Sequence, residues 1–498
     1  MPGLMLNEDD SHFYGSRTPD QMTVEGCQEL VDHYVSPQMK ELIFNPNAMR
    51  TSFPSKVWEP IWADYDPNGP EVQEALKNRD LWKNFAKLWP QNARLMAEKG
   101  IDAYKIWLDY TRQKGISAWV SMRMNDVHDV SVPESLLLSD FWRSHPEYRR
   151  AGYRMESWPD YAFDYGRPEV REHHMKLIRE YFERWDFDGF EMDWMRFGFH
   201  FKPGFEQEGC AQLTDFTAEV RDLAEKWSAK RGHPIRLAAR VPTRPEAALG
   251  LGMDAIEWAR RGLVDVVVVT PFWTSTDTDI PVEMWRQLLG DKVAIAAALE
   301  IGLMPSPESF ADGRFLHTAE TARGTAASFL HRGADRVYLF NYMDSQTTVD
   351  DADDYRQILN HCGCLETATA HPRRHVVSFA DTWAPGQPQP QALPARAAKN
   401  RTAAFRIHIG PRPTASRAQA WIGLGQGGEL DASGLEGRLN TQRLAPTDVK
   451  PPKVHPCVKT LAGFEIDPAT LHDGYNVVEI RATGEQEYKL VWAEIRIG

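Results

Sequence analysis

Eight short β-rich runs, each followed by a longer helix-like segment, restrict the fold of this chain more than any other feature. They are Leu4–Asn7, Glu41–Asn45, Ser117–Met122, Gly189–Trp194, Arg236–Arg240, Val264–Thr270, Val293–Leu299 and Arg336–Phe340. Some of them are nearly continuous apolar runs, which is the pattern of parallel strands that are covered on both faces. Eight such runs alternating with helices over about 360 residues predict an α/β fold, a (β/α)8 TIM barrel.

The segments between these runs carry helical signals. Pro168–Arg184 opens with a proline, which suits the first turn of a helix, and places Val170, Leu177 and Tyr181 on one apolar stripe. The other predicted helices are Thr23–Tyr34, Leu81–Lys99, Asp102–Lys114, Thr214–Lys230, Glu246–Arg261 and Thr318–Arg332. An open, doubly wound sheet is the alternative architecture. No G-x-G-x-x-G motif follows any of the runs, which argues against the dinucleotide-binding form of that sheet.

The sequence pattern changes after residue 370. The stretch 384–390, APGQPQP, predicts a loop or linker. Beyond it, β-like runs follow one another without helices between them, and they include Phe405–Ile409, Trp421–Gly425, Tyr475–Arg481 and Tyr488–Ile497. Apolar and polar residues alternate in the last of these runs, which is typical of a half-buried antiparallel strand. We therefore predict a catalytic barrel over residues 1–370 and a C-terminal β-sandwich over residues 371–498.

Composition limits the classes of partner. The chain has 70 acidic and 57 basic residues and a formal net charge of -13, so its surface repels phosphate backbones and we expect no nucleic-acid partner. The most apolar run, Val264–Val269, contains Asp265 and is far too short to span a membrane, so we expect no membrane partner. Phe, Trp and Tyr make up 11% of the 498 residues, and this excess of flat rings suits stacking against ring-shaped ligands.

The cysteines and the N-terminus bear on the compartment. The five cysteines are scattered, and Cys362 and Cys364 form C-x-C, whereas redox and zinc sites use C-x-x-C. Free thiols in a reducing compartment are therefore expected. The first ten residues, MPGLMLNEDD, lack the basic and apolar regions of an export signal, so we expect a cytoplasmic protein unless a leader has been removed. We expect no cofactor and no resident metal, and the sequence leaves the oligomeric state open.

In a barrel of this kind, functional side chains gather at the carboxyl ends of the strands and on the loops that follow them. Acid, amide, guanidinium and indole groups crowd these positions here. In chain order they are Asp9, Asp10, Asn45, Arg50, Arg123, Asn125, Asp126, His128, Glu191, Asp193, Arg196, Arg240, Trp273, Glu300, Asn341, Tyr342 and Asp344. The opposite strand ends are less polar, so we predict an active site at the carboxyl ends.

The densest motif is the segment Phe187–Arg196, with the sequence FDGFEMDWMR. The period-two alternation of a strand puts Glu191 and Asp193 on the same face. Two carboxylates that face a barrel interior are costly unless they are paired or hydrogen-bonded. We predict that Asp193, which is nearer the strand end, is a general acid or nucleophile. Glu191 either orients Asp193 or forms a buried ion pair with Arg123 or Arg240, and we favour the ion pair.

Three segments carry a resemblance to a known family. Pro168–Arg171 (PEVR) starts a predicted helix, Trp185–Trp194 (WDFDGFEMDW) contains a D-G-x-x-x-D strand, and Ser121–His128 (SMRMNDVH) precedes both. Together they resemble the bacterial glycosyl-hydrolase-like family 10 barrels and their glycosidase relatives, over roughly residues 110–200 and elsewhere only by strand order. The resemblance puts Asp193 at a fourth-strand position where glycosidases keep a catalytic carboxylate. The Asn-Glu ending of the best-known retaining barrels is absent, which leaves open whether Asp193 is the acid or the nucleophile.

The resemblance implies glycoside hydrolysis, which needs two carboxyl groups that flank the scissile bond. Glu300, directly after Val293–Leu299, resembles in position the seventh-strand nucleophile of many retaining barrels. We therefore predict a glycoside hydrolase, acting on an oligo- or polysaccharide, in which Asp193 and Glu300 are the catalytic pair. The rivals of Glu300 are Asp126, Asp164, and the pair Asp277 and Asp279 in a polar loop that is predicted to be solvated. Asp164 alternatively caps the Pro168–Arg184 helix or binds a sugar hydroxyl.

We assign the remaining candidates to contacts with a carbohydrate substrate. They are Asn45, Arg50, Arg123, Asn125, His128, Asp164, Glu191, Arg196, Arg240, Trp273, Asn341 and Tyr342. The arginines suit an acidic or sulfated sugar, and the alternative is that they pair with nearby acids. Tryptophans that follow strands are candidates for stacking on a sugar, namely Trp58, Trp62, Trp142, Trp158, Trp194 and Trp273, whereas those on predicted helices, such as Trp82, are expected to pack.

Two other functions stay open at this point. The first is a metal-dependent sugar isomerase or lyase on the same barrel, which would use His128, Asp126 and Asp193. The second is a non-catalytic glycan-binding protein in which every carboxylate is dispensable.

Overall fold

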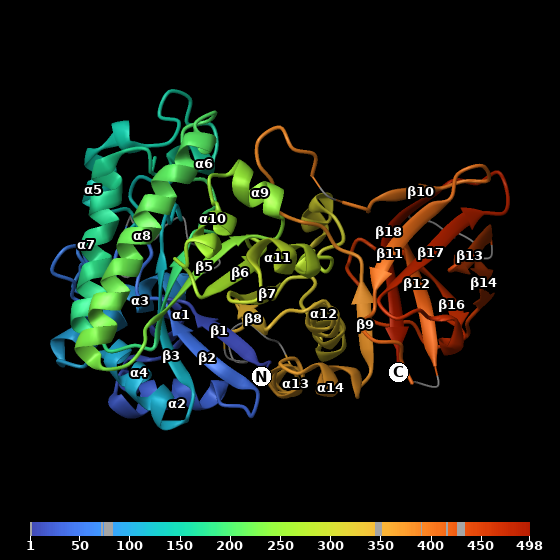
Figure 1. Cartoon of the computed structure of the whole chain (residues 1–498), viewed down its shortest axis with the longest axis horizontal. Helices are drawn as coiled ribbons and strands as arrows, with labels where there is room; N and C mark the ends of the chain where they lie inside the picture. Colours follow the sequence, from blue (N-terminus) through green and yellow to red (C-terminus); the bar gives the residue numbers. More distant parts are fainter. Residues whose placement is uncertain are drawn as a thin grey trace.

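The first part of the chain forms a closed barrel of eight parallel strands in the order β1 to β8 (Figure 1). The structure is a computed structural model that describes residues 2–70, 73, 83–343, 351–389, 391–414, 417–425 and 434–498. The barrel strands are β1 (Leu4–Glu8), β2 (Met39–Phe44), β3 (Ser117–Arg123), β4 (Gly189–Asp193), β5 (Arg236–Pro242), β6 (Val266–Thr270), β7 (Ala294–Glu300) and β8 (Arg336–Phe340). Each lies on one of the eight predicted runs, so the predicted (β/α)8 barrel is confirmed.

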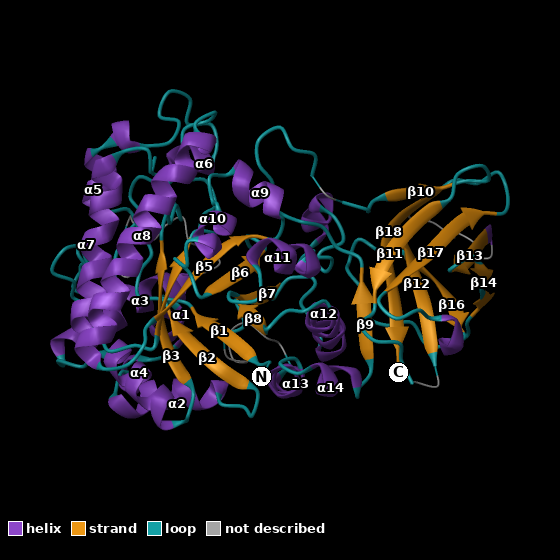
Figure 2. Cartoon of the chain, viewed as in Figure 1, coloured by secondary structure: helices purple, strands orange, loops and turns teal. Residues whose placement is uncertain are grey.

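Helices surround the barrel strands, as Figure 2 shows. They are α1 (His12–Ser16), α2 (Val24–Tyr34), α3 (Lys83–Glu98), α4 (Ala103–Gln113), α5 (Asp140–Ser144), α6 (Trp158–Tyr161), α7 (Pro168–Arg184), α8 (Glu206–Arg231), α9 (Pro245–Gly250), α10 (Ala255–Arg260), α11 (Val282–Leu289), α12 (Ala319–His331), α13 (Ala352–His361) and α14 (Leu365–Thr369). None of the helices in the described ranges is long and apolar enough to cross a membrane.

Two helix predictions were wrong in extent. Helix α8 begins at Glu206, before the predicted start at Thr214. The predicted helix Glu246–Arg261 is two short helices, α9 and α10, because Gly252 has a φ of 90°. This left-handed conformation ends α9 and lets the N–H of Met253 donate to the carbonyl of Ala248.

The alternation of the strands divides their side chains into an outer layer, packed against the helices, and an inner layer that fills the barrel. Met5, Ile43, Trp119, Val268 and Tyr338 belong to the inner layer and are buried. A Cβ atom at Gly189 would lie 2.2 Å from the Trp119 indole, so the glycine of the D-G-x-x-x-D motif makes room for this ring. The same alternation turns the residues two and four positions after Gly189 inward, and these are Glu191 and Asp193.

The C-terminal part consists of two antiparallel sheets. One has the order β10-β18-β12-β16-β15, with β9 also paired to β18, and the other has the order β11-β17-β13-β14. The strands are β9 (Arg373–Val376), β10 (Ala395–Ala397), β11 (Ala403–His408), β12 (Ala418–Leu424), β13 (Leu435–Leu439), β14 (Gln442–Arg443), β15 (Ala445–Pro446), β16 (Thr460–Ile466), β17 (Tyr475–Ala482) and β18 (Tyr488–Ile497). Their inward residues share one apolar core, so the predicted β-sandwich is confirmed. The boundary at residue 370 stays a prediction.

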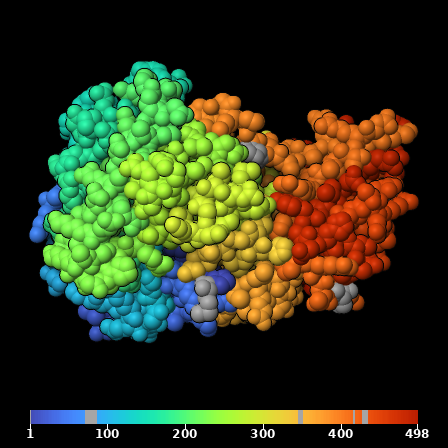
Figure 3. Space-filling model, in the orientation of Figure 1, coloured from blue at the N-terminus to red at the C-terminus, as the bar shows by residue number. Residues whose placement is uncertain are grey.

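The sandwich packs against the side of the barrel, where β9 lies beside α12 (Figure 1). Figure 3 shows the orange and red sandwich in contact with the yellow part of the barrel. Asp279, on the loop after β6, joins the two parts: it receives Arg332 Nη1 of the barrel at 2.7 Å, and Arg406 Nη2 and the Tyr475 hydroxyl of the sandwich at 3.0 and 2.7 Å. Asp277 is buried and pairs with Arg244 at 3.0 Å. The prediction that this polar loop is solvated was therefore wrong.

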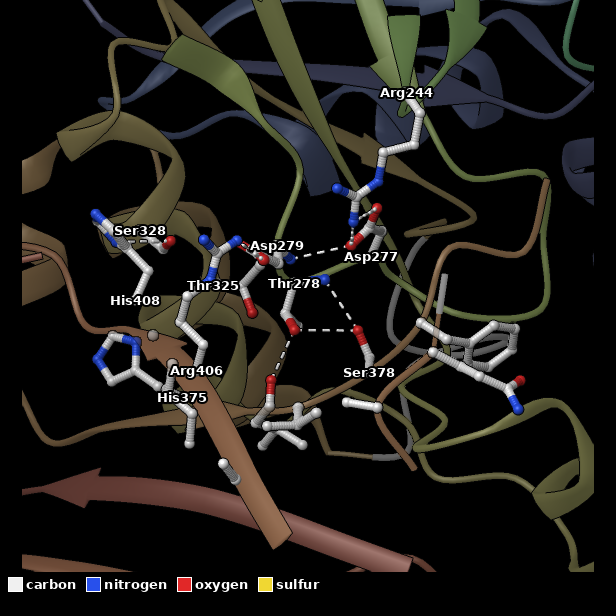
Figure 4. Close-up of a pocket in the computed structure, with 18 residues that line it drawn as sticks. Arg244, Asp277, Thr278, Asp279, Thr325, Ser328, His375, Ser378, Arg406 and His408 are labelled. Atoms are coloured by element: carbon white, nitrogen blue, oxygen red, sulfur yellow. Dashed lines mark hydrogen bonds and ion pairs between the residues drawn. The ribbon is translucent and has the colours of Figure 1, made fainter. Parts of the chain in front are cut away.

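A cavity of about 350 Å³ lies between the barrel and the sandwich (Figure 4). Its walls include Arg244, Asp277, Thr278, Ser378 and His408. Most of their polar groups bond to one another or to the backbone: Thr278 Oγ1 donates to the carbonyl of Val376, for example, and Ser378 Oγ donates to that of Thr276. These bonds make the cavity part of the junction between the two domains.

Candidate active site

Asp193 ends strand β4 with its carboxylate inside the barrel. Its Oδ2 accepts a hydrogen bond from Arg240 Nη1 at 2.6 Å, and its Oδ1 accepts one from the backbone N–H of Met195 at 3.0 Å. Asp193 and Arg240 are register partners on β4 and β5, and neither side chain is more than 3% exposed. The Arg240 guanidinium also lies 3.8 Å from the centroid of the Phe340 ring. This ion pair holds a carboxylate at the carboxyl end of the barrel.

Arg123, the last residue of β3, lies among carboxylates. It contacts Asp10 at 3.0 Å and Asp126 at 3.2 Å, and it donates to Asp9. Burial opposes ionisation of Asp9, but the guanidinium groups of Arg123 and Arg196 hold its pKa well below the usual range. Burial raises the pKa of Asp10 well above the usual range, against the opposing charge of Arg123. Asp9 and Asp10, which follow β1, therefore form one charged cluster with Arg123 and Asp126.

Glu300 ends strand β7 and is fully buried. The side-chain amide of Asn341 donates to both of its carboxyl oxygens, at 3.0 and 2.9 Å. Asn341 follows β8 directly and has a φ of 61°, a left-handed conformation that asparagine tolerates better than most residues. Burial raises the pKa of Glu300 to about 8, although the hydrogen bond from Asn341 lowers it. The carboxyl group is therefore mainly protonated at neutral pH.

Arg196 connects the two candidate catalytic residues electrostatically. Its charge lowers the pKa of Glu300, and the negative charge of Asp193 in turn favours the charged form of Arg196. Its guanidinium lies 5.3 Å from the centroid of the Phe340 ring, which also carries Arg240. Asp193 and Glu300 thus belong to one electrostatic cluster at the carboxyl ends of the strands.

Glu191 lies one layer deeper than Asp193. Its Oε1 accepts hydrogen bonds from Ser121 Oγ at 2.8 Å, the Tyr338 hydroxyl at 2.9 Å and Asn7 Nδ2 at 3.3 Å. The prediction that Glu191 forms an ion pair with Arg123 or Arg240 was wrong, because Arg240 pairs with Asp193 and Arg123 pairs with other carboxylates. Burial raises the pKa of Glu191 to about 7, against the charge of Arg240.

Several residues assigned to the substrate make contacts within the barrel. Asn45 Nδ2 donates to the carbonyl of Ser121 at 3.2 Å, and Asn125 Nδ2 donates to that of Phe163 at 3.0 Å. Arg50 is fully buried and pairs with Asp64 at 2.6 Å. Whether any of these side chains also reaches a substrate stays a prediction.

Asp164 and Tyr342 have similar roles. Asp164 accepts a hydrogen bond from the backbone N–H of Gly166 at 3.0 Å, and it does not cap α7, whose N-cap residue is Arg167. The Tyr342 hydroxyl lies 3.5 Å from the backbone carbonyl of Glu300, and the ring is fully buried. Two residues singled out in the sequence, Asp344 and Trp82, lie outside the described residues.

The imidazole of His128, on the loop after β3, is partly exposed, at 35%. Its Nδ1 lies 2.9 Å from Asp126 Oδ2, and its ring packs against Phe197. Across the described residues, no group of three or more His, Cys, Asp and Glu side chains could hold a metal ion. Asp193 contacts Arg240, so His128, Asp126 and Asp193 do not form the ligand set of the metal-dependent alternative.

Asp381 is a site residue that the sequence did not reveal. It lies between β9 and β10, two strands of the sandwich. Its carboxylate nevertheless accepts the backbone N–H groups of Phe272, Trp273 and Thr274 of the barrel at 2.8, 3.0 and 2.9 Å. Burial raises its pKa despite these bonds, and its charge in turn raises the pKa of Glu300. No local pattern marks Asp381, because its partners are about a hundred residues away in the chain.

No protein-family model and no curated protein sequence matches this chain. Solved structures show partial likeness to this chain. Among them, the chitinase ChiW of Paenibacillus sp. str. FPU-7 is 9% identical, with 98% of this chain and 52% of that chain covered and a TM-score of 0.42. An alpha-galactosidase from Thermus thermophilus is 14% identical, with 75% and 63% covered and a TM-score of 0.37, and the alpha-L-fucosidase isoenzyme 1 of Paenibacillus thiaminolyticus is 12% identical, with 98% and 96% covered and a TM-score of 0.36. The chain spans between half and two thirds of the length of the first two. With TM-scores below 0.5, these likenesses decide nothing about its activity.

Proposed function

We propose that this protein is a glycoside hydrolase that cleaves O-glycosidic bonds in an oligo- or polysaccharide, with Glu300 as the general acid and Asp193 as the second carboxylate. One observation carries the proposal: two carboxyl groups at the carboxyl ends of β4 and β7 have different surroundings, since one lies against a guanidinium group and the other is buried beside a neutral amide. Arg240 pairs with Asp193 at 2.6 Å, whereas burial raises the pKa of Glu300 to about 8. A buried carboxyl group whose pKa is raised toward neutral can serve as the general acid of such a pair.

The two groups supply what the reaction needs. Glu300 gives its proton to the glycosidic oxygen as the bond between that oxygen and the anomeric carbon breaks. An oxygen of Asp193 either bonds to the anomeric carbon from the other side or takes a proton from the attacking water. In the first case, the ionised Glu300 then takes a proton from the water that releases the sugar from Asp193. This first sequence returns Glu300 to its protonated form and Asp193 to its carboxylate form. In the second, Asp193 ends protonated and Glu300 ionised, and exchange of protons with solvent water restores the starting forms.

The surrounding charges support these roles. Arg240 donates a hydrogen bond to the carboxylate of Asp193, and the charge of Arg196 favours the carboxylate that forms when Glu300 has given up its proton. Arg123 and Arg240 are both occupied by carboxylates, so their pairing favours a neutral sugar over the acidic or sulfated sugar that isolated arginines would suit. The resemblance of roughly residues 110–200 to family 10-type barrels points to the same class of reaction.

The proposal is tested by screening p-nitrophenyl glycosides of D-glucose, D-galactose, D-xylose, L-fucose and D-glucuronic acid. We expect hydrolysis of at least one, retained in the presence of a chelator and lost in the variant D193N. E300Q should lose more activity on an oligosaccharide of the same sugar, whose leaving oxygen needs a proton, than on the p-nitrophenyl glycoside. Near-full activity of D193N on a hydrolysed substrate would show that Asp193 is not catalytic. Loss of activity in the chelator would favour the metal-dependent alternative.

A further inference from the structure

Five aromatic rings form a continuous cluster on the loops at the carboxyl ends of the barrel strands, and we call it the aromatic ridge. Its members are Trp158, Phe197, Phe272, Trp273 and Phe310. They come from different loops: Trp158 begins α6 in the connection after β3, Phe197 follows β4, Phe272 and Trp273 follow β6, and Phe310 lies in a short 3₁₀ helix after β7.

The rings support one another. Trp158 stacks on Phe272 with centroids 5.3 Å apart and ring planes 27° apart, and Phe197 contacts both of them at 5.1 and 5.0 Å. Phe272 contacts Trp273 at 6.3 Å, and Trp273 meets the edge of Phe310 at 5.4 Å. The aromatic ridge is therefore several rings long, and it is longer than the contact area that a single sugar ring needs on one indole.

The two ends of the aromatic ridge are exposed, although its middle is buried. Trp158 is 36% and Phe310 is 42% exposed, whereas Phe197 and Phe272 are each 8% exposed. Large apolar rings that face solvent and are fixed by buried neighbours offer contact area that costs little conformational entropy to use. This arrangement is typical of a binding surface rather than of core packing.

The aromatic ridge is continuous with the candidate active site. Phe197 directly follows Arg196, and His128 packs against the Phe197 ring with centroids 4.9 Å apart. At its centre, the backbone N–H groups of Phe272 and Trp273 are held by the buried carboxylate of Asp381. These bonds to a charged acceptor fix the loop that carries both rings.

We propose that the aromatic ridge binds the sugar units of an extended glycan on the loops beside the cleaved bond, so that the preferred substrate is an oligo- or polysaccharide chain and not a single glycoside. The proposal rests on the proposed function for its position beside the catalytic carboxyl groups. Stacking on an aromatic face suits a sugar because one face of a pyranose carries C–H groups, whereas its hydroxyls point outward to water.

The test compares the exposed rings with an exposed ring outside the aromatic ridge. The variants are W158A, F310A and their combination, and the control is Y153A, since Tyr153 is 78% exposed in the same connection between β3 and β4. Each is assayed on the p-nitrophenyl glycoside that the wild type hydrolyses and on the five-unit oligosaccharide of the same sugar. Circular dichroism and thermal melting of each variant verify that it folds.

We expect each ridge variant to lower kcat/KM on the oligosaccharide roughly 2- to 10-fold, mainly through KM, with little change on the p-nitrophenyl glycoside. The double variant should lose roughly the product of the two factors, and Y153A should behave as the wild type on both substrates. Equal effects on both substrates, or losses no greater than that of Y153A, would overturn the proposal.

A binding experiment separates failure of this proposal from failure of the proposed function. Wild type and the double variant are run through native gels that contain soluble xylan, laminarin or galactomannan. If the wild type hydrolyses no glycoside but is retarded in one gel, and the double variant is not, the ridge binds glycans without the chemistry. No hydrolysis together with no retardation of the wild type in any gel would overturn the ridge proposal as well.

Discussion

The two ends of the barrel interior both bury charged side chains, but they balance them differently. At the amino end, Glu41 of β2 receives Arg336 Nε at 2.8 Å and Arg236 Nη2 at 3.1 Å, so two guanidinium groups surround one carboxylate. At the carboxyl end, the acids outnumber the arginines that contact them, and Glu300 is held by the neutral amide of Asn341. Burial leaves Glu300 protonated, with a pKa of about 8.

This difference shows which buried charges can do chemistry. A carboxylate that is paired with two guanidinium groups, such as Glu41 of β2, links its strand to β5 and β8 across the barrel interior. A carboxyl group that is buried without a direct cation keeps its proton near neutral pH and can donate it. Both arrangements arise from inward-facing positions on the strands, so burial alone does not mark an active site, whereas incomplete charge pairing does.

The largest expected effect is on Asp193 at the carboxyl end. In D193N, the side chain keeps its shape but loses the charge that attacks or activates water, so we expect kcat/KM on a hydrolysed glycoside to fall at least about 10³-fold. The matched control is E41Q, an acid-to-amide change at the other end of the barrel, which should keep near-wild-type activity in its folded fraction. Equal losses in the two variants would mean that the two ends do not differ as argued.

The second prediction concerns the proton on Glu300. In the wild type, kcat/KM should fall as pH rises through about 8, because Glu300 loses the proton that the leaving oxygen needs. In E300Q, we expect a loss of about 10²- to 10⁴-fold and no alkaline limb near pH 8. The pH dependence of kcat/KM on an oligosaccharide of the hydrolysed sugar measures both, because its leaving oxygen needs a proton, whereas p-nitrophenolate leaves without one. An unchanged alkaline limb in the residual activity of E300Q would assign that limb to another group.

The third prediction concerns stability at the amino end. E41Q removes the negative charge that Arg236 and Arg336 share at a buried carboxylate, so we expect a loss of about 1–3 kcal/mol in the free energy of unfolding. Part of each arginine is solvated, which keeps the loss below that of a fully buried pair. Urea titration followed by circular dichroism measures it. D193N also replaces a carboxylate with an amide beside an arginine, Arg240. Comparing the loss of unfolding free energy in E41Q with that in D193N tests whether the ion pairs at both ends stabilise the fold.

The smallest effect is expected at Asn341. Its φ of 61° suits glycine, so N341G removes the amide donor with little backbone strain. Because that amide stabilises the ionised form of Glu300, its loss should raise the pKa of Glu300 further and move the alkaline limb of kcat/KM upward by less than about one pH unit. A shift to lower pH would contradict the role given to this hydrogen bond.

The strand rhythm predicted the barrel well because it is a local property. All eight strands lie on the predicted runs, and α7 has the predicted ends Pro168 and Arg184. The split between α9 and α10 was missed because it depends on the left-handed φ of Gly252, and apolar periodicity does not report a backbone angle. The predicted ion pair of Glu191 failed for a different reason. Its hydrogen-bond partners Ser121 and Tyr338 come from other strands, and Arg240 pairs with Asp193.

The sequence by itself determined the barrel, the β-sandwich, and the set of polar residues that follow the strands, because alternation and strand order decide which side chains face inward and at which end they lie. Only the tertiary structure decided which acid pairs with which arginine, that Glu300 is left with an amide as its partner, and that Asp381 holds the loop of Phe272 and Trp273. The physical reason is that protonation depends on burial and on charges a few ångströms away, and these neighbours come from segments far apart in the chain.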